Sequence, residues 1–192
     1  MSGDGARKGV AAGVAPCPMP AGKVAMAEDF EICPGCGGRY PVGDGPQHAY
    51  MLGVAGCWRL FGQLLAAEYS DTALLQVHRL SVDTYALQHP GDPNDRRAVQ
   101  SVGLHLARVM LQLEAPRPPR ETNEVMLGFA ARKASLVWLE PPARFSMTLA
   151  DLAPEIGGSG HAAAVREWAS ETWQDWSAHH AYIRDWVAGA VG

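Results

Sequence analysis

The sequence has no long hydrophobic run and no cluster of basic residues. Hydrophobic residues make up 47% of the chain, yet no apolar stretch approaches the ~20 residues that a membrane-spanning helix needs. The formal net charge is −4, whereas nucleic-acid binding usually leaves a basic footprint. We therefore expect neither a membrane nor a nucleic acid as a partner.

Cysteine is also scarce. The chain of 192 residues contains four cysteines, which is too few for a disulfide scaffold and suits a cytoplasmic protein with reduced thiols. Residues 1–30 are interpreted as a flexible tail rather than a signal peptide, because Pro and Gly interrupt every apolar stretch there. Cys17 lies in this tail and is interpreted as a bystander. Residues 31–192 are expected to form a single domain.

Helical periodicity dominates the rest of the chain. Apolar residues recur at three and four positions, as on the buried face of a helix. Four tryptophans near the C-terminus are interpreted as core residues on such a face. The pattern predicts an all-α fold, a bundle of about four main helices behind a loop-rich N-terminal segment. The expected helices cover residues 57–69, 72–88, 95–113, 121–135 (more weakly) and 161–187.

The motif that carries chemistry is "ICPGCGGRYP", residues 32–41. Cys33 and Cys36 have the C-x-x-C spacing of a zinc knuckle, and the surrounding glycines permit the tight turn that directs two thiolates inward. Cys57 is the expected third ligand. It lies at the start of the first expected helix, where the positive end of the helix dipole favours a thiolate. The alternative for the knuckle is a turn with reduced, unpaired cysteines. We predict a zinc-binding segment over residues 31–57.

Two histidines are candidates for the fourth ligand. His48 lies in the same loop segment as the knuckle. His89 follows the second helix, and an antiparallel hairpin that runs ~18 Å out and ~25 Å back returns it to the end at which Cys57 begins. We prefer His89 and keep His48 as the alternative.

A second set of residues is a candidate catalytic site. If the second and third helices face each other, His78 and His105 lie at nearly the same height, with Asp83 below them, and His180 faces inward from the last helix. Helical metal enzymes assemble their sites from histidines and carboxylates in this way. Ordinary bundles also bury such residues as satisfied polar groups. Tyr85 and Gln88 are candidate partners of this set, or else packing residues.

Several stretches together resemble a known family. "CPGCG", "GPQHAY", "GCW", "VDTYALQHPG", "QSVGLHL" and "WASETWQDWSAHHAYIRDW" are similar to an uncharacterised bacterial family of small helical proteins. The resemblance covers about residues 31–187. It implies that the knuckle and the helices belong to one domain, and it implies no substrate.

Two functions from different classes fit these observations. The first is a small-molecule metabolic enzyme, in which zinc pins the N-terminal loop and His78, Asp83, His105 and His180 perform acid–base chemistry. The second is a non-enzymatic metal-binding or protein-interaction module with purely structural zinc. A polar, roomy cavity between the helices would favour the enzyme, and an apolar, filled interior with an exposed knuckle would favour the module. The sequence predicts neither a substrate nor an oligomeric state.

Overall fold

The structure is a computed structural model that describes residues 29–191. The expected tail lies almost wholly outside these residues, as does Cys17. The described part is 63% helical, so the prediction of an all-α bundle is confirmed. Its seven α-helices are α1 (Ala55–Ser70), α2 (His78–Gln88), α3 (Arg96–Glu114), α4 (Pro119–Arg132), α5 (Leu149–Leu152), α6 (His161–Asp175) and α7 (His180–Val191).

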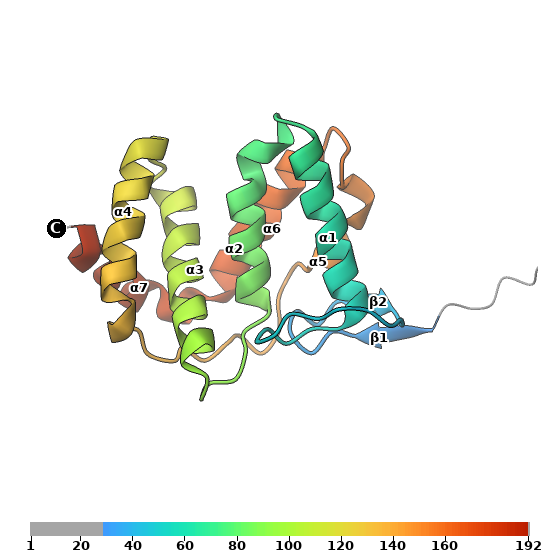
Figure 1. Cartoon of the computed structure of the whole chain (residues 1–192), viewed down its shortest axis with the longest axis horizontal. Helices are drawn as coiled ribbons and strands as arrows, with labels where there is room; N and C mark the ends of the chain where they lie inside the picture. Colours follow the sequence, from blue (N-terminus) through green and yellow to red (C-terminus); the bar gives the residue numbers. More distant parts are fainter. Residues whose placement is uncertain (1–28, 192) are drawn as a thin grey trace, which may run out of the picture.

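The helices form two layers around a shared core. In Figure 1, α4, α3, α2 and α1 stand side by side from left to right, and α6 and α7 cross behind them. Helix α6 packs on α2, whereas α7 packs on α3 and α4. The buried core includes the four C-terminal tryptophans, as the sequence predicted: Trp168, Trp173, Trp176 and Trp186. Each described helix is too short or too polar to cross a membrane.

A small β-hairpin replaces part of the expected N-terminal loop. Strands β1 (Phe30–Ile32) and β2 (Arg39–Pro41) pair in antiparallel register, with Glu31 opposite Tyr40. This hairpin lies at the end of the bundle where α1 begins (Figure 1). The pairing fixes both ends of the turn that carries Cys33 and Cys36.

Local capping explains several helix boundaries. The Asp95 carboxylate accepts a hydrogen bond from the Arg97 backbone N–H at 2.8 Å, which caps the first turn of α3. The Asp71 carboxylate accepts one from the Ala73 N–H at 2.8 Å, so the expected break after α1 is present. The second helix begins with a 3₁₀ segment (Leu74–Val77) before α2 proper.

The prediction of one continuous helix over residues 161–187 is wrong, because the chain breaks at Trp176. The His180 ring stacks on the Trp173 ring with centroids 3.7 Å apart, and His180 Nε2 donates to the Trp173 carbonyl at 2.7 Å. That carbonyl also accepts from the Trp176 N–H at 3.1 Å, in place of the Ser177 N–H that a continuing α-helix would supply. A 3₁₀ segment (Ser177–His179) then redirects the chain into α7, which allows α7 to cover α3 and α4.

Candidate metal centre

Four side chains that are far apart in the sequence meet at the base of α1 and α2. The Sγ atoms of Cys33, Cys36 and Cys57 and a ring nitrogen of His89 all lie within 4.8 Å of one another. None of the four residues is more than 2% exposed. The structure therefore brings together the three cysteines expected from the sequence and the preferred histidine.

The knuckle is held by its own backbone. The Gly37 N–H donates to the Cys33 carbonyl at 2.9 Å, and the Cys33 N–H donates to the Gly38 carbonyl at 2.9 Å. Gly37 has a φ of +77°, a conformation that side chains disfavour. At Gly35, an added Cβ would lie 2.4 Å from the Leu52 carbonyl oxygen and 2.6 Å from the His89 ring. Glycine is thus required for the knuckle to approach the histidine.

The α1–α2 hairpin supplies the other two ligands. Cys57 lies in the first turn of α1, and His89 caps the C-terminus of α2. The Tyr85 ring stacks between His89 and Phe61, with centroids 3.9 and 3.8 Å away. This stack fixes the imidazole plane and joins the two helices at the height of the cysteines.

One hydrogen bond determines which nitrogen of His89 faces the cysteines. Nδ1 lies 2.7 Å from the Tyr85 carbonyl oxygen, which can only accept, so Nδ1 carries the proton. Nε2 faces the sulfur atoms, 3.2 Å from Cys57 Sγ and 3.5 Å from Cys33 Sγ. Metal-ligating histidines characteristically donate their other N–H in this way.

Hydrogen-bond donors also surround the sulfur atoms. The Tyr40 hydroxyl lies 3.4 Å from Cys36 Sγ, and the Tyr85 hydroxyl lies 3.7 Å from Cys57 Sγ. The Gly38 N–H donates to Cys36 Sγ at 3.4 Å. Burial, followed by the charge of the nearby cysteines, raises the pKa of both tyrosines, so both hydroxyls keep their protons. These donors compensate negative charge on the thiolates.

The cluster favours ionisation of Cys33 in particular. Hydrogen bonds from the Cys36 and Cys57 thiols lower the pKa of Cys33, while hydrogen bonding to Cys33 and Cys36 raises the pKa of Cys57. Burial alone would lower the pKa of His89, but its bonds to Cys33 and Cys36 raise that pKa to about 9. A divalent cation would displace the protons that remain on the sulfur atoms when it binds.

The donor set and its size fit zinc. Zinc–sulfur bonds of about 2.3 Å and zinc–nitrogen bonds of about 2.0 Å give a tetrahedron with edges of about 3.6 Å. The Nε2–Sγ distances of 3.5 and 3.2 Å lie close to that edge, and all four donor atoms lie within 4.8 Å of one another. Three thiolates with one imidazole form a recognised structural zinc set. The described residues therefore form a Cys₃His cluster that can hold a metal ion.

His48 lies apart from this cluster. Its ring packs edge-on against Tyr50 and Trp58, at centroid distances of 4.4 and 5.4 Å. The Tyr50 N–H donates to His48 Nδ1 at 3.5 Å. Burial lowers the pKa of this histidine, which keeps it neutral. The alternative fourth ligand is a packing residue of the N-terminal segment.

The four residues of the candidate catalytic site have different partners. His105 Nδ1 donates to Asp83 Oδ1 at 2.7 Å, so these two do meet. His78 Nδ1 lies 2.8 Å from a Glu68 oxygen instead, and His180 bonds to the Trp173 carbonyl. Among the described residues, no hydrogen bond joins His78 or His180 to the Asp83–His105 pair. Gln88, a candidate partner, donates to the Thr172 hydroxyl at 2.9 Å.

A buried carboxylate that the sequence analysis missed is Glu68. One of its oxygens accepts from the Ser81 hydroxyl and lies 3.3 Å from His161 Nε2, while the other binds His78. Glu68 is fully buried. The sequence contained a sign of this burial, because Glu68 follows Phe61 and Leu64 at helical spacing on the apolar face of α1. A carboxylate on that stripe indicates a buried, partnered acid.

Comparison with known proteins identifies the family and nothing narrower. A family model described as "Family of unknown function (DUF5946)" matches residues 31–177, which contain the whole Cys₃His cluster. No curated protein and no solved structure matches the chain. The resemblance to an uncharacterised family is confirmed. The chain therefore belongs to the family of unknown function DUF5946.

Proposed function

We propose that this protein is a zinc protein in which one zinc ion fastens the N-terminal segment to the helical bundle. The observation that carries the proposal is the convergence of Cys33, Cys36, Cys57 and His89 in a fully buried cluster. Zinc is the metal that such a thiolate-rich, tetrahedral set selects among the common divalent ions.

The role is structural rather than catalytic. Catalytic zinc sites use three protein ligands and leave a position open for water or substrate. Here four protein ligands are available, and all of them are buried. A cavity of about 590 Å³ does lie between the helices, but its walls contain none of the four ligands and none of the four candidate catalytic residues. The geometry therefore favours the non-enzymatic hypothesis over the enzyme.

The N-terminal segment buries little apolar surface that could hold it against the bundle. Several of its large apolar residues face solvent: Phe30, Ile32, Val42 and Leu52. Between residues 29 and 54 the buried side chains are chiefly Cys33, Cys36 and Tyr40, all at the cluster. A segment with so little apolar burial gains its order from the metal, as small zinc domains do.

A pair of histidine variants tests the proposal. His89→Ala should lose bound zinc and melt at a lower temperature, because it removes the only described nitrogen ligand and uncovers the Tyr85 ring. His48→Ala should retain one zinc per chain, because His48 lies outside the cluster. Metal analysis and thermal melts of both variants give the readout. Zinc loss in His48→Ala, or full zinc retention in His89→Ala, would contradict the assignment.

A further inference from the structure

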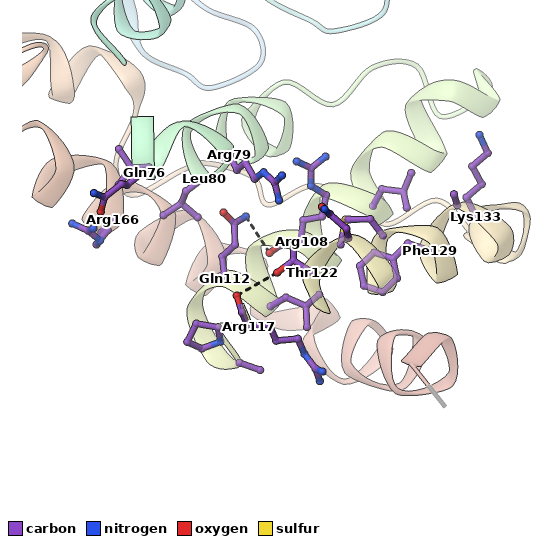
Figure 2. A pocket seen from close by; sticks show the side chains of 18 residues that line it. Gln76, Arg79, Leu80, Arg108, Gln112, Arg117, Thr122, Phe129, Lys133 and Arg166 are labelled. Carbon is purple, nitrogen blue, oxygen red and sulfur yellow. Dashed lines mark hydrogen bonds between the residues drawn. The ribbon is translucent and has the colours of Figure 1, made fainter. Parts of the chain in front are cut away.

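A cavity lies near the N-terminal end of α2, whereas the metal cluster lies at the C-terminal end of that helix. This cavity of about 590 Å³ opens between α2, α3 and α4, and α6 contributes one residue to its wall. Clefts of this volume are typical of small-molecule sites. Figure 2 shows its wall, which is formed by side chains from segments far apart in the sequence.

The cavity is strongly cationic in a chain that is anionic overall. Five basic residues line it and no acidic residue does: Arg79, Arg108, Arg117, Lys133 and Arg166. They lie around the cavity rather than at one point, with Arg166 and Lys133 at opposite ends (Figure 2). The chain has a formal net charge of −4, so the charge of the cavity is opposite in sign to that of the chain as a whole. The concave shape concentrates this positive potential.

Most of this positive charge has no partner. Arg117 lies 3.9 Å from Glu121, which is a weak contact across one helical turn. Within the described residues, no ion pair involves Arg79, Lys133 or Arg166. Arg166 uses only one of its terminal nitrogens, in a bond to the Ala162 carbonyl. These side chains are therefore free to bind an anion.

A buried acid holds one of the cationic side chains, Arg108, in place. Asp83 is fully buried, and its Oδ1 lies 3.1 Å from Arg108 Nε in an ion pair. Its Oδ2 accepts from Gln112 Nε2 at 2.8 Å, and His105 completes the group. Asp83 binds Arg108 through Nε, which leaves the two terminal nitrogens of the guanidinium for a ligand. Asp83 is thus a positioning residue for this wall.

The base of the cavity is apolar. Leu80, Leu111 and Phe129 are buried and line it together with Met126. An inorganic anion would leave this surface uncovered, whereas a neutral apolar molecule would leave the cations without partners. The walls complement a ligand that combines an acidic group with an apolar body.

We infer that this cavity binds a small organic anion with an apolar body, of the carboxylate or phosphate-monoester class. The cationic side chains of the wall, Arg79, Arg108 and Arg166 among them, supply positive potential and hydrogen-bond donors for the acidic group. The surface formed by Leu80, Leu111, Met126 and Phe129 covers the apolar body. This site is separate from the metal cluster and does not depend on the function proposed for it.

Fluorescent probes test the inference on the full-length, metal-loaded chain. Anilinonaphthalene sulfonate is an apolar anion, and N-phenylnaphthylamine is a neutral molecule of similar shape. The anion should bind saturably with one site per chain and at least about tenfold more tightly than the neutral probe, because it gains charge-assisted hydrogen bonds. Equal affinities, or no saturable binding of the anion, would overturn the proposal.

Matched arginine variants locate the site. The double variant Arg79→Gln with Arg166→Gln should weaken binding of the anionic probe about tenfold or more, and the corresponding double lysine variant should restore most of it. Arg120→Gln is the control, because Arg120 lies on the same helix as the cavity residues of α4 but is 92% exposed and outside the wall. Unchanged binding in the double glutamine variant, or equal loss in Arg120→Gln, would overturn the assignment.

Competition distinguishes the acidic groups. Decyl phosphate and decanoate should both displace the probe, and the stronger of the two identifies the preferred head group. Decanol and inorganic phosphate should displace it only at much higher concentration, because each supplies half of the required chemistry. Displacement by decanol as efficient as by both anions would overturn the proposal.

Discussion

Replacing Cys57 with serine is expected to release the metal ion and to cause a large loss of stability. Cys57 is fully buried, and a serine hydroxyl is a poor zinc ligand at neutral pH. Structural zinc contributes on the order of 10 kcal/mol to the folding of small zinc peptides. Only part of that stabilisation is expected to be lost here, because the helices have a hydrophobic core of their own. Each kcal/mol lost lowers Tm by about 2–4 °C in a chain of this size. Metal analysis and thermal melts measure both effects.

The control for this variant is Cys17→Ser. Cys17 lies outside the described residues, and the sequence predicts that it takes no part in the zinc site. Cys17→Ser should therefore retain the metal content and the melting temperature of the wild type. Full metal content in Cys57→Ser, or loss of metal in Cys17→Ser, would show that the ligand set is assigned wrongly.

Replacing Glu68 with alanine is expected to lower the free energy of unfolding by about 3–5 kcal/mol, as the loss of one partner in a buried polar cluster does. The Glu68 carboxylate accepts from Ser81 and from two histidines, His78 and His161. The Gly157 N–H donates to His161 Nδ1 at 3.0 Å, so the His161 proton lies on Nε2, facing Glu68. Without the carboxylate, the buried His161 N–H loses its acceptor, and Ser81 keeps only its longer bond to the Val77 carbonyl at 3.3 Å.

Denaturant unfolding of a matched pair of variants measures this loss. Glu167 is exposed and lies on α6, which also carries His161. Glu167→Ala should change the free energy of unfolding by no more than about 0.5 kcal/mol, as surface substitutions usually do. If Glu68→Ala cost no more than Glu167→Ala, the buried network would not contribute to stability as described.

The metal cluster was accessible from the sequence because local geometry determines it. The Cys33–Cys36 spacing is a short-range signal. The return of His89 to Cys57 follows from two antiparallel helices of similar length, which helical rise alone can place. Even the choice of His89 over His48 follows from that geometry.

Other features depend on contacts between distant residues, which periodicity does not report. Glu68 and His161 meet across 93 positions in the chain. The break at Trp176 arises from the His180–Trp173 contact, although the apolar pattern continues through it. Matched heights along α2 and α3 placed His105 level with His78 and Asp83 below them, whereas in the structure His105 bonds to Asp83. They did not reveal that His78 turns toward Glu68, because height does not fix the direction of a side chain around a helix.

The most direct test of the central claim is the metal content of the purified, full-length chain together with its response to a chelator. The buried Cys₃His cluster predicts one zinc ion per chain and a clear fall in Tm when a strong chelator removes it. Protein that is isolated without metal, takes up no zinc and melts at the same temperature with and without the chelator would contradict the account.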